Sequence, residues 1–264
     1  MIGCGHMGSA LLKSWTSNTK NKFYIIDPLQ YKKINNKFKN KVTTFNQIDK
    51  IKNLTTIDII IFAVKPQIIQ DVLKKFINLK FKEKILFISI VAGKKINFFN
   101  NFLQDQNQFI RAMPNMPALI DQGMTCLVAN KNVDESNRKF VNSLFTFVGK
   151  TLWLKKETDI NKITAISGSG PAYVFLFIDA FEQAALKLGL ENKVTKNLVK
   201  QTFLGSLNLF LEANTEASIL ANNIAVKGGT TEAALKKFKN KKILHKVFSE
   251  AVKAAFKKAN ELGK

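Results

Sequence analysis

The chain has 264 residues, of which 46% are hydrophobic and 23% are charged. That composition is typical of a soluble globular protein with one large or two ordinary domains, and it excludes disorder of the whole chain. The 41 Lys and Arg residues outnumber the 19 Asp and Glu residues, which gives a formal net charge of +22.

Residues 1–154 alternate short apolar runs with amphipathic stretches, which is typical of a dinucleotide-binding domain with a doubly wound, Rossmann-type α/β sheet. Helices are expected at Gln67–Leu79 and Asp134–Phe147, and the low-complexity stretch Lys32–Lys41 is interpreted as a solvated helix end and loop. The longest apolar runs suit strands buried on both faces of a parallel sheet. The predicted strands are Phe23–Ile26, Ile57–Val64, Ile85–Val91, Phe109–Ala112, Met124–Ala129 and Thr151–Leu154.

Residues 155–264 show only helical patterns, and we predict an all-helical domain there. Its first long helix, Tyr173–Leu188, is hydrophobic around most of its circumference and must therefore be buried on several sides. In so small a domain, a subunit interface suits such a helix better than a monomer core. The helices expected after it are Lys193–Leu211, Ser218–Ala225, Thr231–Phe238 and Lys242–Leu262.

Gly3, Gly5 and Gly8 form a GxGxxG motif ahead of a helical stretch. In dinucleotide-binding proteins the first glycine allows a tight turn, the second lets the backbone approach a pyrophosphate, and the third lets the helix pack on the strand. The pyrophosphate binds at the helix N-terminus, where free N–H groups and the helix dipole favour an anion. We therefore predict that this loop, with His6 and Met7 in it, binds a dinucleotide.

Asp27 ends the first complete predicted strand, nineteen residues after the last glycine of the motif. An acid at this place binds a ribose hydroxyl in NAD enzymes. Its charge favours NAD by repelling a 2′-phosphate, whereas Lys32, Lys33 and the positive net charge favour NADP, and the sequence leaves the choice open. Only Met1 and Ile2 precede the motif, so the first strand is expected either to begin upstream or to be a stub.

Three segments follow predicted strands and are expected at the carboxyl edge of the sheet, where open α/β sheets bind ligands. Two of them, AVKP and SIVAG, are assigned to the cofactor. The third, Arg111–Ala118, holds Asn115 in an irregular backbone that two prolines fix. The residues assigned to the cofactor from these segments are Ala63, Val64, Lys65, Pro66, Val91 and Ala92.

Two motifs mark the helical half. The segment Ile166–Tyr173 (ISGSGPAY) combines two glycines with a proline, which start or kink the long helix and allow close backbone packing. The segment KGGTT precedes a later helix, so Thr230 can cap that helix and the N–H groups from Gly228 to Thr231 can hold an anion of carboxylate size.

Six segments occur in one order along the chain: GCGHMG, AVKPQ, SIVAG, RAMPNMPALIDQG, ISGSGPAYVFLFIDAF and GGTTEAAL. Over nearly its whole length the chain thereby resembles the pyrroline-5-carboxylate reductase family, which performs the last step of proline synthesis. The resemblance implies that the N-terminal half binds NADPH, or alternatively NADH. It also implies that the C-terminal helices form a homodimer, which in some members assembles into a decamer.

The resemblance places the substrate, 1-pyrroline-5-carboxylate, between the nicotinamide and the loop before the GGTT helix. It implies that Thr231 hydrogen-bonds the ring nitrogen, and that backbone amides of the loop hold the carboxylate. The family usually has Ser-Pro before GGTT, whereas this chain has Val226 and Lys227, and Lys227 could add a charge there. The residues assigned to the substrate beside Thr231 are Asn115, Lys227, Gly228, Gly229 and Thr230.

The implied reaction also fits the absence of a recognisable acid–base pair. A cyclic imine is already electrophilic, so hydride transfer to it needs no His–Asp pair and no activated nucleophile. His6 and His245 are accordingly not expected to be catalytic. We expect proximity and orientation to carry the catalysis, with the cofactor fixed by one domain and the acid group of the substrate by a helix N-terminus of the other.

Three alternatives are weighed. The first is a reductase for another cyclic imine. The second, a β-hydroxyacid dehydrogenase, needs a lysine on the long helix, where none occurs until Lys187. The third is a non-catalytic protein that binds anionic polymers through Lys236–Lys242 and the net charge. Because Lys, Asn, Ile and Phe are abundant together and only Arg111 and Arg138 are arginines, the charge indicates a coding bias, and no specific nucleic acid is expected.

The cellular setting follows from what the sequence lacks. Its clean apolar runs are far shorter than the roughly 20 residues of a membrane span, and its start does not resemble a secretory signal. Cys4 and Cys126 cannot form a disulfide framework and show no metal-ligand spacing. We expect no transmembrane helix, no membrane partner, no bound metal and a cytoplasmic location.

Overall fold

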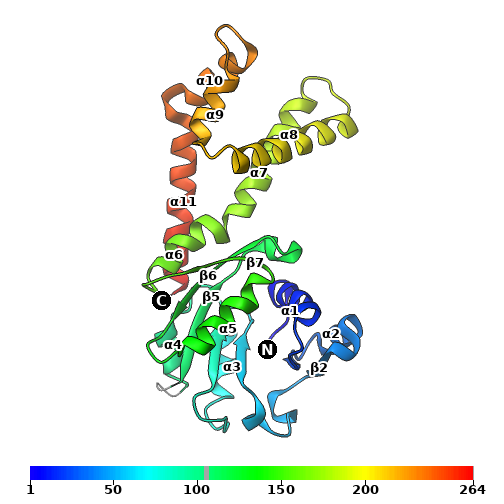
Figure 1. The fold of residues 1–264 in the computed structure, drawn as a ribbon, viewed down its shortest axis with the longest axis vertical. Coiled ribbons are helices and arrows are strands. Elements are labelled where there is room, and N and C mark those ends of the chain that lie inside the picture. Colours follow the sequence, from blue (N-terminus) through cyan, green and yellow to red (C-terminus); the bar gives the residue numbers. More distant parts are fainter. Residues whose placement is uncertain (104–106, 264) are drawn as a thin grey trace. The chain divides into compact units, whose positions relative to one another are not determined.

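The computed structural model describes residues 1–103 and 107–263, which form two compact units. The sheet unit comprises Met1–Ser169 and the end of the chain from Ala255, and the helical unit comprises Gly170–Ala254. In Figure 1 the strands of the sheet unit run from blue to green, and the helices of the helical unit from yellow-green onward. The boundary between residues 154 and 155 stays a prediction, because units defined by contacts need not coincide with folding domains.

Strands β1 and β2 pair with each other, and β3 to β7 pair in sequence order. Neighbouring strands are parallel except β5 and β6, which are antiparallel. The direction reverses there because the 3-10 turn Met116–Ile120, and no crossover helix, connects these two strands. All six predicted strands are confirmed, with ends shifted by at most two residues. The strands are β1 Phe23–Ile26, β2 Val42–Phe45, β3 Ile59–Phe62, β4 Leu86–Ser89, β5 Gln108–Met113, β6 Gly123–Ala129 and β7 Gly149–Trp153.

Ile2 takes the place of the first strand and joins the two groups of strands. It forms parallel bridges to Ile26 at the end of β1 and to Phe62 at the end of β3. Its N–H donates to the carbonyl of Ile61 at 2.7 Å, and its carbonyl accepts from Ala63 at 2.8 Å. The resulting order is β2-β1-Ile2-β3-β4-β5, which is the doubly wound order with its switch point beside the glycine motif. Ile2 therefore occupies the position of the first strand in this order.

Helices cover both faces of the sheet. One buried cluster contains side chains of α3, α4 and α6, including Phe99, whose ring lies 4.8 Å from that of Phe109 in β5. The other contains Trp15 of α1 with Leu144 and Phe145 of α5, and the Trp15 indole N–H donates to the Leu144 carbonyl at 2.8 Å. These helices are α1 His6–Asn18, α3 Ile69–Lys74, α4 Ile96–Asn100, α5 Glu135–Thr146 and α6 Asp159–Ile163.

The lysine-rich stretch after β1 differs from its interpretation as a solvated helix end and loop. Tyr31–Phe38 forms the helix α2, and Ile34 and Phe38 are buried in it. Because only these two apolar positions recur among lysines and asparagines, the composition concealed an amphipathic helix. The strand β2 that follows was not predicted. Together α2 and β2 extend the sheet beyond β1.

The helical unit contains four complete helices and the first turns of α11. The ring of Phe203 in α8 lies 6.3 Å from that of Phe177 and 6.1 Å from that of Phe181, both in α7. None of the described residues of α7 is buried, and Leu176 is 69% exposed. So apolar a helix requires a covering surface beyond this chain. The helices are α7 Gly170–Leu186, α8 Asn192–Glu212, α9 Ala217–Ile224, α10 Thr230–Lys239 and α11 Ile243–Leu262.

The expectation of no membrane-spanning helix requires a qualification. The helical stretch Asp159–Leu186 is long and apolar enough to cross a membrane by length and composition, with a mean hydropathy of 1.3 in its most apolar window. Only 6% of that window is buried. Polar residues interrupt its first turns, so the stretch contains no continuous apolar run of that length.

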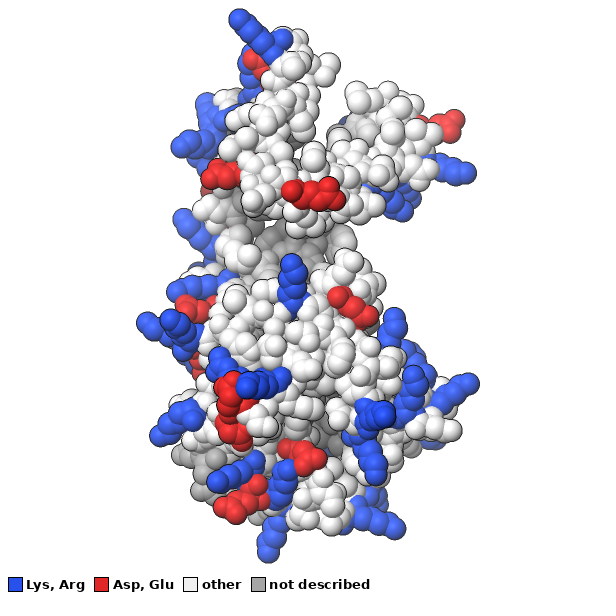
Figure 2. All heavy atoms as spheres, viewed as in Figure 1, with Lys and Arg blue, Asp and Glu red and all other residues white. Residues whose placement is uncertain are grey.

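Charged side chains are distributed widely. Figure 2 shows Lys and Arg side chains spread over the visible surface, with Asp and Glu side chains among them, rather than gathered in one patch. On this face, the charge is therefore not concentrated in one basic patch, and the absence of a nucleic-acid partner stays a prediction.

Candidate functional site

The glycine motif lies at the switch point of the sheet, and the loop after β3 packs directly against it. Gly3 has a φ of +81°, and a Cβ built on it would lie 2.6 Å from Cγ1 of Val64 and 2.8 Å from the carbonyl oxygen of Ala63. A Cβ on Gly8 would lie 3.3 Å from the carbonyl of Gly3 and 3.5 Å from the Ala63 side chain. Because Gly3 and Gly8 lack a Cβ, the turn of the glycine motif and the start of α1 can pack directly against the loop after β3.

Gly5 differs from the other two, because it borders open space. In the part of the chain that the structure describes, no heavy atom other than those of Gly5 and its two chain neighbours lies within 4 Å of a Cβ built on Gly5. Gly5 is also the N-cap of α1, and no described side chain caps that helix end. The N–H groups of its first turn, which contains the exposed His6 and the half-buried Met7, thus face a position where a pyrophosphate fits.

The Asp27 carboxylate is held by backbone groups. Its Oδ2 accepts from the N–H of Cys4 at 3.0 Å, and its Oδ1 accepts from the N–H groups of Leu29 at 3.1 Å and Gln30 at 2.9 Å. The residue is 8% exposed. Asp27 therefore ties the glycine loop to the end of β1 and shapes the turn that leads into α2. Its sequence position suggests a ribose ligand, but the sequence does not reveal these three bonds.

The residues assigned to the cofactor after β3 and β4 lie at adjacent strand ends. Lys65 is exposed, and Pro66 half-buried, in the turn after β3. Ile90, after β4, donates its N–H to the carbonyl of Phe62 in β3 at 3.0 Å. Val91 is buried and donates its N–H to the Ser89 hydroxyl at 3.2 Å. The half-buried Ala92 follows it.

Asn115 spans two segments of the sheet unit. Its Nδ2 donates to the carbonyl of Ser167 at 2.9 Å, and its Oδ1 accepts from the N–H of Met124 at 2.8 Å. Ser167 lies in the π-helical turn Thr164–Gly168, whose wider hydrogen bonding leaves carbonyls for other donors. A Cβ on Gly168 would lie 3.1 Å from Cε of Met113, whereas one on Gly170 would have no described heavy atom within 4 Å beyond its neighbours. The close backbone packing expected of the ISGSGPAY segment therefore stays a prediction. Both the amide nitrogen and the amide oxygen of Asn115 are therefore hydrogen-bonded to backbone groups, and these bonds fix the loop after β5.

The five remaining assigned residues lie in the helical unit, at the start of α10. Gly228 has a φ of +77° and donates its N–H to Oε2 of Glu232 at 2.9 Å. Gly229 is the N-cap, so the expectation that Thr230 caps the helix is wrong. Because Thr230 and Thr231 are the first two helical residues, their N–H groups have no partner within the helix. The exposed Lys227 precedes this turn.

An ion pair between a buried arginine and a half-buried glutamate supports the sheet unit and was not predicted. Arg111 in β5 is 2% exposed, and its Nη1 donates to Glu157 at 3.1 Å. Glu157 also accepts from the N–H of Ile96 at 2.8 Å. Arg111 Nη2 lies 3.4 Å from Oδ1 of Asn161, whose Nδ2 donates to Asn260 at 2.9 Å.

The rarity of arginine was the available signal for this pair. In a chain with 41 basic residues, only two are arginines, and both use the shape of the guanidinium. Arg111 forms the network just described, and Arg138 lies over the ring of Trp153 at 4.0 Å. A lysine at either position would lose the planar group, so a coding bias toward lysine leaves arginine where its geometry is needed.

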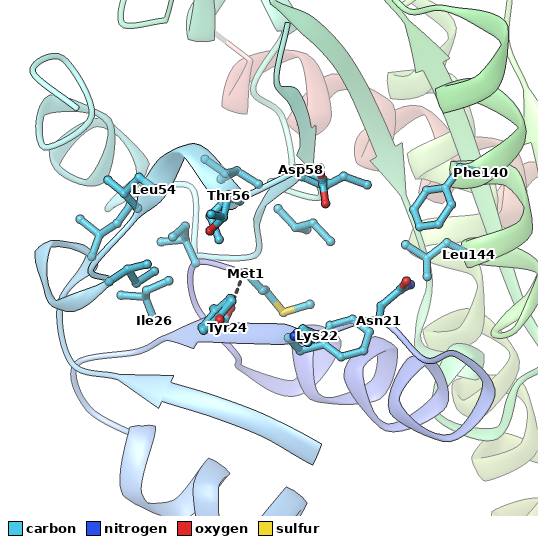
Figure 3. A pocket seen from close by; sticks show the side chains of 18 of the residues that line it. Met1, Asn21, Lys22, Tyr24, Ile26, Leu54, Thr56, Asp58, Phe140 and Leu144 are labelled. Carbon is cyan, nitrogen blue, oxygen red and sulfur yellow. Dashed lines mark hydrogen bonds between the residues drawn. The ribbon is translucent and has the colours of Figure 1, made fainter. Parts of the chain in front are cut away.

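A cavity of about 650 Å³ lies away from the glycine loop, between β1, β3 and α5 (Figure 3). It is lined by the beginnings of β1 and β3, including Tyr24 and Ile59, and by Phe140 and Leu144 of α5. This is the amino edge of the sheet, whereas the assigned residues occupy the carboxyl edge. The cavity is therefore separate from the candidate site.

A doubly wound sheet with a glycine loop at its switch point defines a dinucleotide-binding enzyme of the Rossmann class. Residues 1–93 match a family model described as NADP oxidoreductase coenzyme F420-dependent, and residues 157–262 match one described as pyrroline-5-carboxylate reductase dimerisation. Among curated relatives, pyrroline-5-carboxylate reductase of Haemophilus influenzae is 36% identical over 78% of this chain and 75% of its own.

Solved structures agree with this relationship. A pyrroline-5-carboxylate reductase from Coxiella burnetii superposes with a TM-score of 0.85 at 32% identity, over 100% of this chain and 97% of that one. The Plasmodium falciparum pyrroline carboxylate reductase with NADP bound gives 0.84 at 32% identity, with the same coverage. This chain belongs to the pyrroline-5-carboxylate reductase family. The helical half is accordingly the dimerisation domain, which accounts for the exposed apolar surface of α7.

Proposed function

We propose that this chain reduces 1-pyrroline-5-carboxylate to proline with a reduced nicotinamide dinucleotide. Family membership supports the reaction. The observation that carries the proposal is the open phosphate position above Gly5, at the uncapped start of α1. A second helix start, at Thr230, offers backbone N–H groups of the kind that bind a carboxylate.

The chain's own residues have two tasks in this mechanism. The first turn of α1 and the loops after β3 and β4 hold and orient the cofactor, which when bound supplies a hydride from its nicotinamide. The N–H groups of Thr230 and Thr231 bind the substrate carboxylate, because those of Gly228 and Gly229 already donate to Glu232 and to the Val226 carbonyl. The Thr231 hydroxyl hydrogen-bonds the ring nitrogen, which retains its proton as the adjacent carbon is reduced. Catalysis then depends on orientation rather than on a general base.

NADPH is proposed as the preferred cofactor over NADH. The charge of Asp27 is directed at three backbone N–H groups, which weakens its repulsion of a 2′-phosphate. Lys32 and Lys33 in the first turn of α2 supply positive charge a few residues later in the same segment. The NADP-bound relative from Plasmodium falciparum supports this choice.

The substitution Asp27→Asn tests the role of that carboxylate. It places an amide opposite the N–H of Cys4, so a loop-holding role predicts weaker binding of NADPH and NADH together, with their ratio near the wild-type value. Discrimination by charge predicts instead that NADH binding weakens while NADPH binding improves. Dissociation constants for both cofactors, measured by quenching of tryptophan fluorescence, separate these outcomes.

We further propose a homodimer, with assembly into a decamer as the larger alternative, and a soluble, cytoplasmic protein. The exposed side chains of α7 support self-association. Both cysteines are free and buried, which suits a reducing compartment. Sedimentation analysis distinguishes the dimer from the decamer.

The deciding experiment follows NADPH and then NADH absorbance after addition of pyrroline-5-carboxylate, at low and moderate salt. We expect substrate-dependent oxidation by the wild type. In the variant Gly5→Leu, the added side chain starts from a Cβ with no described heavy atom within 4 Å beyond its chain neighbours, so the variant should retain the melting temperature and lose cofactor binding. Cofactor binding without turnover would contradict the proposed substrate and favour another cyclic imine. The replacement of the family's usual Ser-Pro by Val226 and Lys227 would then account for the different substrate.

A further inference from the structure

The last turn of α11 lies against the loop that follows β4, within the sheet unit. Gly93 has a φ of +79°, and a Cβ built on it would lie 2.7 Å from Cβ of Leu262 and 2.8 Å from the carbonyl carbon and oxygen of Leu262. A Cβ on Gly263 would lie 2.7 Å from the carbonyl oxygen of Gly93. The loop and the helix end therefore meet backbone to backbone, at a distance that glycine alone permits on either side.

Side-chain bonds hold the same two segments from a second direction. Glu157 accepts from the N–H of Ile96, which begins α4 directly after the loop. The Asn161 amide donates to Oδ1 of Asn260, in the last turn of α11. Arg111 bonds Glu157 and Asn161, so it connects these two contacts. The end of α11 is thus fixed to the framework that supports the loop.

The loop held in this way carries Val91 and Ala92, at the carboxyl end of β4. Its neighbour β3 ends in the segment that packs on Gly3 and Gly8, and Ile90 donates its N–H to the last carbonyl of β3. The glycine loop and the loop after β4 consequently share one edge of the sheet, on either side of β3. A ligand that extends from the phosphate position along this edge meets Val91 and Ala92.

We propose that the last turn of α11, Asn260–Gly263, is a positioning element that sets the Val91–Gly93 loop against the nicotinamide half of the cofactor. The inference rests on the proposed function. Neither Asn260 nor Leu262 touches substrate or cofactor in this role, and both act through the loop. A displacement of about 1 Å at a reacting centre lowers rates by as much as about 100-fold, so a small shift of this loop has a measurable effect.

Two substitutions test the contact. Gly93→Ala introduces a methyl group into it, and Asn260→Ala removes the bond to Asn161 while leaving the loop sequence unchanged. Asn260→Asp retains the accepting oxygen and should restore wild-type behaviour. The matched control is Gly189→Ala, because Gly189 also has a left-handed backbone, with a φ of +87°. Beyond its chain neighbours, no described heavy atom lies within 4 Å of a Cβ built on it.

The first readout is hydrogen exchange of residues 90–96 in the cofactor-free protein, and the second is the dissociation constant for NADPH. We expect Gly93→Ala and Asn260→Ala to speed exchange in this segment and to weaken NADPH binding several-fold, with Gly189→Ala and Asn260→Asp close to wild type. Turnover should fall by about 10- to 100-fold, and a deuterium isotope effect from 4-deuterated NADPH should increase as hydride transfer becomes limiting.

Wild-type exchange and wild-type NADPH affinity in both Gly93→Ala and Asn260→Ala would overturn the proposal, even if their melting temperatures fall. Equal effects in Gly189→Ala would also overturn it, because a general loss of stability would then be enough to explain the faster exchange and the weaker NADPH binding. If the wild type binds NADPH but does not reduce pyrroline-5-carboxylate, the proposed substrate fails, while exchange and affinity still decide the role of the helix end. A wild type that binds no dinucleotide overturns both.

Discussion

The guanidinium of Arg111 and the carboxylate of Glu157 meet at 3.1 Å inside the sheet unit, joining β5 to the residues that lead into α6. Burial lowers the pKa of the Arg111 guanidinium, and the bond to Glu157 opposes that shift. Such a pair contributes little beyond what apolar residues of equal volume would give, yet the loss of one partner leaves a buried charge uncompensated. The ion pair therefore contributes less to overall stability than to determining which segments of the chain pack together.

Glu157→Ala should lower the free energy of unfolding by about 3 kcal/mol, the cost of leaving a buried cation without its partner. Urea denaturation of the wild type and the variant measures this difference. The control is Glu135→Ala, which breaks the exposed pair with Lys139 at 4.0 Å and should cost less than about 1 kcal/mol. Similar losses in the two variants would show that the Arg111 pair is no more than a surface contact.

This pair also shows where sequence reasoning reaches its limit. Periodicity located the strands because apolar runs are local signals, and the glycine motif located α1 for the same reason. The contact between Arg111 and Glu157 depends on how distant segments pack, which no local pattern encodes. The strand β2 was missed because Val42–Phe45 is short and its two threonines break the apolar run.

In the candidate site, too, local sequence signals were predictable and contacts between distant segments were not. Glycines and prolines at strand and helix ends predicted where the segments fall in the fold, and the segments assigned to the cofactor lie at one edge of the sheet, although their role stays a prediction. The function of individual side chains was not predictable, since Asp27 and Asn115 both use their polar atoms on backbone groups of other segments. Gly228 has a left-handed backbone, so the chain changes direction one residue before Gly229. Gly229 is therefore the N-cap, and Thr230 is the first residue of the helix.

The two thiols should react slowly in the folded protein. Burial raises the pKa of the Cys4 thiol and of the Cys126 thiol, so each carries less thiolate at neutral pH than a free cysteine. Titration with a chromogenic disulfide reagent should give little reaction in buffer and two thiols per chain in denaturant. Rapid modification of native protein at neutral pH would contradict both burial and the raised pKa.

Stability should decline in acid partly through Asp134. This residue caps α5 by accepting from the N–H of Asn137 at 2.7 Å, and it also accepts from the Gln108 amide, so the pKa of its carboxyl lies below its ordinary value. A lowered folded-state pKa stabilises the protein above the unfolded-state value of about 4, and this contribution disappears as the pH falls through the folded-state pKa.

The comparison that isolates this effect is wild type against Asp134→Ala across pH 2 to 7, by thermal denaturation. The advantage of the wild type should be greatest above about pH 4 and should shrink steadily below it. A difference that stays constant with pH would assign the effect to the shape of the cap and not to its charge.

Thr231→Val tests the most specific chemical role assigned here, the hydrogen bond to the ring nitrogen of the substrate. The branched side chain retains its volume and loses only the hydroxyl. A hydrogen bond to a charged group contributes about 1.5 to 3 kcal/mol, so kcat/KM should fall by roughly 10- to 100-fold. Thr231→Ser retains the hydroxyl and should preserve most of the activity, and NADPH affinity should be unchanged in both variants.

The matched control is Thr202→Val in α8, where the lost hydroxyl bonds only the Leu198 carbonyl of its own helix at 2.8 Å. It should leave kcat/KM at the wild-type value. Equal activity of Thr231→Val and Thr231→Ser would remove the hydroxyl from the mechanism and leave the backbone N–H groups of α10 as the substrate contacts. A fall in NADPH affinity in Thr231→Val would instead move this residue from the substrate to the cofactor.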